Sequence, residues 1–130
     1  FAIVLSCIDS RTSAELIFDQ GLGDIFSARI AGNVLNNDIL GSMEFACKVA
    51  GAKLIVVLGH SKCGAIKGAC NHVEMGHLTG LLNKIGPALH AIRQADGVPV
   101  EGDELVERVA LENMRHQMRA ILERSPILEH

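Results

Sequence analysis

Three short aliphatic runs that alternate with helix-like stretches constrain the fold of this chain more than any other feature. The runs are rich in Ile, Val and Leu, as buried strands are, and they span 2–6, 25–30 and 53–58. Capping residues, glycine stops or helical spacing of apolar residues predict helices over 14–20, 39–50, 63–70, 78–94 and 104–124. Strands that alternate with helices in this way predict an α/β fold with a central, mainly parallel β-sheet flanked by α-helices.

Several local features refine this outline. Pro87 lies inside the 78–94 pattern and either kinks that helix or starts a new turn. The 97–102 segment reads as a linker before the last long helix, and Cys47 is expected in the core because it lies in the middle of a predicted helix. The last helix keeps its helical period through Leu105, Val109, Leu111, Met114, Met118, Ile121 and Leu122.

Length, charge and cysteine content narrow the class of protein. A chain of 130 residues suits a single domain over 1–130, with room for a sizeable core. A net charge of −3 and an aromatic content of 3% argue against a nucleic-acid partner. No apolar run approaches the ~20 residues of a membrane span, so no direct membrane insertion is expected. Four cysteines in an α/β chain are typical of buried thiols or metal ligands, which favours a reducing, cytoplasmic location.

Cysteine and histidine follow two of the predicted strands directly. Cys7 comes after the first strand, and His60 and Cys63 form a short chelating pair after the third. Ligands gather at the carboxyl ends of parallel strands, and catalytic zinc sites use three Cys or His ligands plus an open position. The sequence therefore predicts a zinc site at this edge of the sheet. The alternative is that the two cysteines are small core residues and the histidine a capping residue.

Cys70 is a poor substitute for these ligands. It follows Cys63 by seven residues, which is about 10 Å along a helix. Two thiolates on one zinc must each lie about 2.3 Å from it, so Cys63 and Cys70 cannot share the ion if that helix forms.

Asp9 and Arg11 follow Cys7 at intervals of two residues, which places the three side chains on one face of an extended segment. A carboxylate beside the metal can accept a hydrogen bond from a group bound there, or can occupy the open position itself. A guanidinium can hold that carboxylate in a fork and keep it off the metal. The alternative is a helix-capping aspartate and an unrelated surface arginine.

Four motifs, in order and with fitting spacing, give the chain a resemblance to the β-class carbonic anhydrases. The first, at 7–11, resembles the family's C-x-D-S-R and the last, at 59–64, its G-H-x-x-C-G. Between them, 29–33 resembles R-x-A-G-N and 41–46 resembles G-S-x-E-[FY]-A. The resemblance covers 1 to about 69; beyond that point only the helical pattern is similar.

The resemblance implies reversible hydration of carbon dioxide to bicarbonate and a proton by a zinc-bound hydroxide. It implies Cys7, His60 and Cys63 as zinc ligands with Asp9 and Arg11 as the catalytic pair. It further implies self-association as a dimer or tetramer, and a carbon dioxide pocket lined by Phe26, Phe45 and Gly64. The two phenylalanines could equally be plain core aromatics.

The ligand set also implies a pH dependence. Zinc lowers the pKa of bound water to about 7 in a carbonic anhydrase site built from three histidines. Two thiolates donate more charge to the metal than two imidazoles do, so this water should ionise at higher pH and activity should rise into the alkaline range.

The chain departs from the family pattern in three respects. It begins after the N-terminal helical segment and the substrate-directed Gln of family members, and we find no strand after its last helix. It also has no Trp and no Tyr, so the bicarbonate effector site of one subgroup is not expected. Two other functions remain open at this stage: hydrolysis of carbon disulfide or carbonyl sulfide on the same scaffold, and a non-catalytic zinc-binding regulatory domain of a larger protein.

Overall fold

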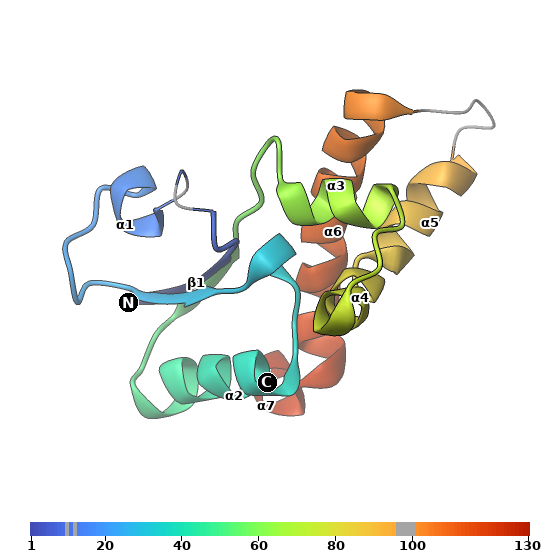
Figure 1. Ribbon diagram of the computed structural model, residues 1–130. Helices are drawn as coiled ribbons and strands as arrows, with labels where there is room; N and C mark the ends of the chain where they lie inside the picture. Colours follow the sequence, from blue (N-terminus) through green and yellow to red (C-terminus); the bar gives the residue numbers. More distant parts are fainter. Residues whose placement is uncertain (10, 12, 96–100) are drawn as a thin grey trace.

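The computed structural model describes residues 1–9, 11, 13–95 and 101–130, and it contains a parallel three-stranded sheet (Figure 1). The strands are β1 (Ala2–Ser6), β2 (Phe26–Arg29) and β3 (Leu54–Val57), in the order β2-β1-β3. β1 pairs with both neighbours, and Leu5 lies level with Ala28 and Val57. Every residue of β1 is buried, as expected for an aliphatic strand in the centre of the sheet. The α/β prediction and all three strands are confirmed.

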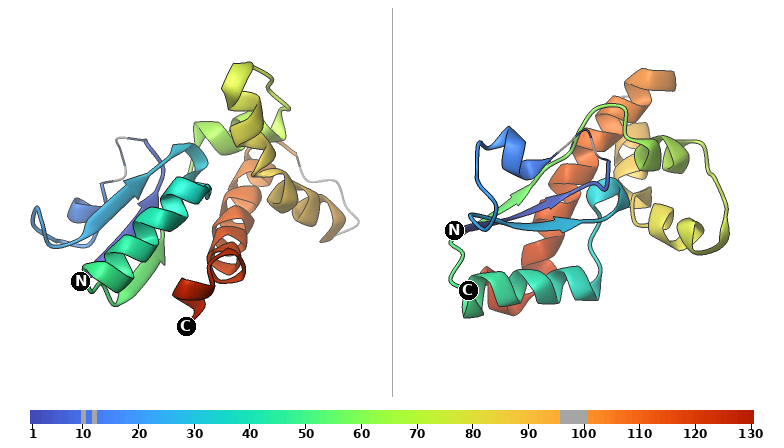
Figure 2. Two further views of the ribbon diagram at one scale, coloured as in Figure 1. Left: turned by 90° about the horizontal axis from the view of Figure 1, so that it is seen from below. Right: turned by 60° about the vertical axis from the view of Figure 1, so that its left-hand side comes forward.

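Helices cover the sheet on both faces (Figures 1 and 2). The short α1 (Ala14–Ile17) lies on one side, and α2 (Asn37–Glu44) runs across the other. The Asn36 side chain accepts a hydrogen bond of 2.8 Å from the Ile39 N–H and caps α2. The predicted 14–20 helix is thus shorter than expected, since the chain turns away after Ile17.

The predicted 39–50 helix is not a single α-helix. After α2 the chain widens into the π-helix η2 (Phe45–Val49), in which the Ala50 N–H bonds to the Phe45 carbonyl at 3.0 Å. The wider turn changes which side chains face the sheet, so Ala46 is buried while Cys47 is only half-buried. The expectation that Cys47 is a core residue is therefore only partly met.

The second half of the chain is helical throughout its described part. α3 (Gly64–Cys70) begins after Cys63, which is the N-cap residue and not, as predicted, part of the first turn. The predicted 78–94 helix is two helices, α4 (Gly76–Asn83) and α5 (Gly86–Ala95). Pro87 is the second residue of α5, where its missing N–H costs nothing, so it starts a helix and does not kink one.

The long α6 (Gly102–Arg124) and the short α7 (Pro126–Glu129) end the chain, and most of the predicted 97–102 linker lies outside the described residues. α6 buries only part of the face that its apolar pattern predicts: Leu105, Val109 and Ile121 are buried as expected. Leu111, Met118 and Leu122 are about half exposed, at 48%, 50% and 50%. The buried face comprises Leu105, Val106, Val109, Asn113, Gln117, Ala120 and Ile121.

Two apolar clusters hold these elements together. One lies between the sheet, α2 and the end of α6, and includes Leu5, Leu35 and Met43. The other lies among α3 to α6 and reaches the carboxyl edge of the sheet, where it includes Cys7 and Cys63. None of the helices in the described part of the chain is long and apolar enough to cross a bilayer.

Candidate metal centre

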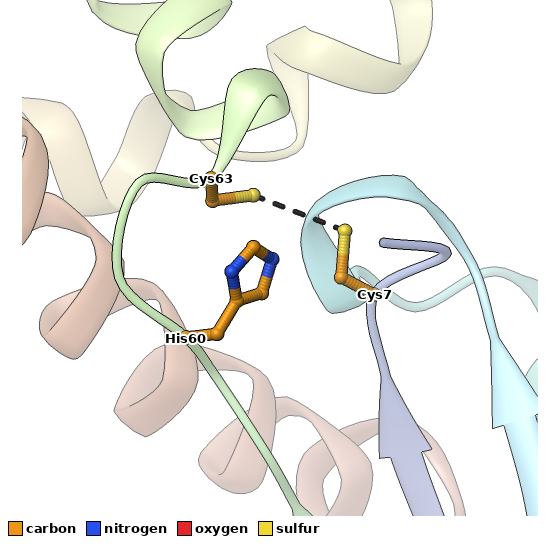
Figure 3. Close-up of side chains that lie close together, drawn as sticks. All are labelled: Cys7, His60 and Cys63. Carbon is orange, nitrogen blue, oxygen red and sulfur yellow. Dashed lines mark hydrogen bonds between the residues drawn. The ribbon is translucent and has the colours of Figure 1, made fainter. Parts of the chain in front are cut away.

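Cys7, His60 and Cys63 converge at the carboxyl edge of the sheet, from two separate loops (Figure 3). Cys7 follows β1 directly, and the 58–63 turn carries His60 and Cys63 from the end of β3 to the start of α3. The Leu58 N–H continues the β1–β3 ladder to the Leu5 carbonyl at 2.8 Å, which fixes where this turn begins. One ligand atom from each residue lies within 4.8 Å of the other two. The predicted convergence of these side chains is confirmed.

The separation of the two sulfur atoms fits a shared metal ion. The Sγ atoms of Cys7 and Cys63 lie 3.9 Å apart, far beyond the length of about 2.05 Å of a disulfide bond. Two thiolates at about 2.3 Å from one tetrahedral zinc would lie about 3.8 Å apart. The structure therefore holds the sulfur atoms at the spacing that a zinc ion requires.

The His60 ring is turned so that one nitrogen can serve as a ligand. Its Nδ1 lies 2.7 Å from the Ser61 carbonyl, which can only accept, so Nδ1 carries the proton and donates. Nε2 then has a lone pair, and it is buried with no hydrogen-bond partner. Buried polar atoms rarely remain unpaired, and a ligating histidine usually donates its other N–H to a carbonyl or carboxylate. Together with two thiols, the ring supplies a donor set that suits zinc.

The two thiols differ in their surroundings. Burial opposes ionisation of Cys7, but the His60 imidazole and the backbone N–H groups of Asp9 and Gly32 outweigh it and lower the pKa of the Cys7 thiol. Burial raises the pKa of Cys63, and the neighbouring Cys7 adds to the rise. Cys7 is therefore the first of the pair to reach the thiolate form that metal binding needs.

Asp9 and Arg11 form the ion pair that the sequence predicts. The Arg11 Nη2 lies 2.6 Å from Asp9 Oδ2, and Nε lies 3.0 Å from Oδ1. The backbone N–H of Arg11 also donates to Oδ1 at 2.9 Å. Hydrogen bonds from the Arg11 side chain hold the pKa of the Asp9 carboxyl well below its usual range, and the same pairing raises the pKa of Arg11. Ser10, between them, lies outside the described residues.

Two further residues, to which the sequence analysis gave no role, hold these loops. The Arg29 guanidinium donates to the Cys7 carbonyl at 2.8 Å and also to the Asp9 carbonyl, so it fixes the backbone on both sides of Ile8. Glu107 on α6 accepts from the Lys62 N–H at 3.0 Å. Lys62 has a left-handed φ of 54°, which is uncommon for a residue other than glycine, and its carbonyl accepts from Arg11 Nη2 at 3.3 Å. The signal for Arg29 was its place in the R-x-A-G-N stretch; nothing in the sequence marked Glu107.

The three residues expected in the substrate pocket do not lie together. Gly64 follows Cys63 at the start of α3. Phe26 and Phe45 contact each other edge to face, with ring centroids 6.4 Å apart, and line a hollow of about 570 Å³ between β2 and α2. Phe26 is level with Ile3, whereas the metal centre lies beyond Ser6. Within one chain, two other hollows lie beside the centre. One of about 240 Å³ is lined by Gly59, His60, Ser61, Glu107, Ala110, Leu111 and Met114. The other, of about 430 Å³, is lined by Ser61, Lys62, Cys63, Lys67, Asp103, Val106 and Glu107.

Known proteins share both the sequence and the fold of this chain. The family model described as carbonic anhydrase matches residues 2–130. The carbonic anhydrase of Mycolicibacterium smegmatis is 43% identical over 99 residues, which cover 72% of this chain and 48% of that protein. Carbonic anhydrase 2 of Mycobacterium tuberculosis is 51% identical over 79 residues, which cover 61% of this chain and 38% of that protein. The chain thus spans about half the length of these relatives or less.

A more distant relative is named for a different activity. The carbon disulfide hydrolase of Acidithiobacillus thiooxidans is 31% identical over 77 residues, which cover 55% of this chain and 36% of that protein.

Solved structures agree with the sequence matches. The β-carbonic anhydrase CcaA superposes with a TM-score of 0.89 and 27% identity, over 98% of this chain and 61% of that one. A tetrameric β-carbonic anhydrase of Sordaria macrospora superposes with a TM-score of 0.87 and 25% identity, over 98% of this chain and 66% of that one. Because the family model covers nearly the whole chain and these neighbours are β-class enzymes, the chain belongs to the β class of the carbonic anhydrase family.

Proposed function

We propose that this chain binds one zinc ion through Cys7, His60 and Cys63 and catalyses the reversible hydration of carbon dioxide to bicarbonate and a proton. The observation that carries the proposal is the convergence of two thiols and an unpartnered imidazole nitrogen at one strand edge. The Asp9–Arg11 pair follows Cys7 in the sequence, and Arg11 donates to the Lys62 carbonyl in the loop that carries the other two ligands. A purely structural zinc site would close its fourth position with another Cys or His, and among the described residues no further Cys or His joins this cluster.

The protein's own groups have distinct tasks in this proposal. When bound, zinc would supply an acidic water and a positive centre for the charge that develops on the substrate. Asp9, kept ionised by Arg11, accepts a hydrogen bond and so orients a proton-bearing group at the centre. Arg11 holds both carboxylate oxygens and restrains Asp9 from turning toward the metal. The His60 Nδ1–H bond to Ser61 fixes the ring with Nε2 toward the thiols.

Substrate and assembly belong to the same proposal. We assign Phe26, Phe45 and Gly64 to the carbon dioxide pocket, with the two phenylalanines, exposed by 40% and 54%, supplied at a contact between copies of the chain. The tetrameric Sordaria macrospora relative supports self-association. The four free thiols suit the reducing cytoplasm. Carbon disulfide hydrolysis is the second candidate, favoured by the relative from Acidithiobacillus thiooxidans.

The test is a zinc titration with an assay of carbon dioxide hydration from about pH 6.5 to about 9, the range around the ionisation of zinc-bound water. Cys63→Ser removes a proposed ligand. Cys70→Ser is the matched control, because Cys70 is also buried and lies outside the cluster.

We expect one zinc per chain and activity that rises with pH, both lost in Cys63→Ser and kept in Cys70→Ser. Zinc binding without carbon dioxide hydration would contradict the assigned reaction. In that case turnover of carbon disulfide would select the second candidate, and no turnover would select a non-catalytic zinc domain. A wild-type chain that binds no zinc would refute the proposal outright.

A further inference from the structure

Two buried amides lie on the face of α6 that packs toward the site. Asn113 is 0% exposed and Gln117 is 3% exposed, and they stand one helical turn apart among apolar residues. Burying an amide is unfavourable unless its polar atoms find partners. Neither side chain belongs to the two apolar clusters, so the contribution of these amides lies in the backbone groups to which they hydrogen-bond.

The two amides form hydrogen bonds with the backbone segment that follows β2. Asn113 Nδ2 donates to the Gly32 carbonyl at 2.8 Å. Gln117 Nε2 donates to Asn113 Oδ1 at 3.1 Å, and Gln117 Oε1 accepts from the Leu35 N–H at 3.2 Å. The chain of bonds ties residues 32 and 35 to α6, about eighty positions later in the sequence.

Gly32 connects this chain of bonds to the metal centre. Its own N–H donates to Cys7 Sγ at 3.4 Å, while its carbonyl is held by Asn113. Its left-handed φ of 70° brings the N–H and the carbonyl to these two partners at once. A displacement of Gly32 that followed the loss of its carbonyl's partner would therefore also move its N–H relative to the sulfur atom.

We propose that Asn113 is a positioning residue for the ligand sulfur of Cys7, and that it acts through Gly32. The inference rests on the proposed zinc site and extends it to a residue on α6 that touches neither the ion nor its ligands. An N–H donor draws electron density from a thiolate and fixes its direction, so its loss changes both the strength and the geometry of the ligand. Groups that orient a metal ligand typically contribute 10- to 100-fold in metal affinity.

The test compares Asn113→Leu with Gln117→Leu. The first removes the donor to Gly32 and keeps a similar volume. The second is the matched control: it is on the same buried face and also leaves two polar groups unpaired, but the Asn113–Gly32 bond stays. Zinc affinity is measured by competition with a chromogenic chelator. The sulfur-to-cobalt charge-transfer band of the cobalt-loaded protein reports on the thiolate itself, which a general loss of stability would not move.

Asn113→Leu should bind zinc about 10- to 100-fold more weakly and shift the cobalt band to longer wavelength, because the sulfur atom holds its electrons less tightly. Gln117→Leu should unfold more easily but keep the band in place. If Asn113→Leu does not fold, Asn113→Ser replaces it, since a helix carbonyl can satisfy the shorter hydroxyl.

An unchanged band and a zinc affinity within about twofold of wild type in the Asn113 variant would overturn the proposal. Equal shifts in both variants would also overturn it, because the effect would then be one of general packing. A wild-type chain that binds neither metal would refute the zinc site itself, and it would do so before any variant is made.

Discussion

Replacing Gly32 by alanine should destabilise the chain, for two reasons that can be separated. The residue has a φ of 70°, which costs an L side chain roughly 1–2 kcal/mol. An added Cβ would also lie 3.0 Å from Ile85 Cδ1 and 3.3 Å from Ala65 Cβ. Ile85 is 0% exposed and has little room to move, and overpacking of this kind costs about 1–3 kcal/mol.

The net loss is smaller than the sum of these two costs. Alanine has fewer unfolded conformations than glycine, which returns about 0.4–1 kcal/mol. We therefore expect Gly32→Ala to lose about 1–5 kcal/mol of unfolding free energy. Because the chain has no Trp and no Tyr, far-ultraviolet circular dichroism in a urea titration is the suitable measurement.

Two other glycines separate the backbone cost from the packing cost. Gly51 has a φ of 83° with no atom within 4 Å of an added Cβ, so Gly51→Ala carries the backbone cost alone. Gly41 lies inside α2 with open space around it, and Gly41→Ala should gain about 0.5–1 kcal/mol. If Gly32→Ala proves no less stable than Gly51→Ala, the contacts with Ile85 and Ala65 carry no energetic weight and the reasoning is wrong.

Three further predictions concern the site. In Arg11→Ala the pKa of Asp9 should rise toward its ordinary value near 3.9, as carbon-13 NMR of the carboxyl would show. Because the pKa of Asp9 is depressed in the folded state, the pair stabilises the chain above the ordinary pKa of the carboxyl, and this stabilisation is lost as the pH falls. An Asp9 titration that did not move in Arg11→Ala would show that Arg11 is not the cause of the depressed pKa. Glu107→Ala should weaken zinc binding by about 2- to 10-fold, because the Lys62 N–H loses its acceptor. Glu107→Gln keeps an acceptor and should leave zinc binding unchanged. Equal losses in the two variants would show that Glu107 acts through its charge and not through this hydrogen bond. Zinc at about 100 times its dissociation constant should add about 2.7 kcal/mol of stability, and a chelator should remove it; a melting temperature indifferent to chelation would count against a folded-state site.

The arrangement of the candidate ligands could be predicted because it follows from topology. Parallel strands present their carboxyl ends at one edge, so Cys7 and His60 had to approach each other once both strands were recognised. The Asp9–Arg11 pair is similarly local, since only one residue separates the partners in the sequence. Neither prediction required knowledge of how the helices pack.

The packing of the helices could be predicted only in part: on α6, Leu105, Val109 and Ile121 are buried as expected. Periodicity counts apolar residues, and on α6 that count favours a face with Leu111 and Met118, both about half exposed in the structure. The face that is buried includes Asn113 and Gln117, whose polarity is compensated by partners about eighty residues away in sequence. Such partners are long-range, so no local pattern reveals them. The π-helix at Phe45–Val49 is a further case, because the spacing of apolar residues over 39–50 does not distinguish its wider turn from an α-helical one.

The role of α6 links these observations. Glu107 holds the turn that carries His60 and Cys63, and Asn113 holds the carbonyl of Gly32, the residue whose N–H donates to Cys7. The two anchors lie about 9 Å apart along one helix, so its rigidity sets the distance between the two loops. A substitution that displaces α6 should therefore alter metal binding even where it touches no ligand. The effect should decline from Asn113 to Gln117, because Gln117 binds Asn113 and Leu35 but not Gly32, the residue that contacts Cys7.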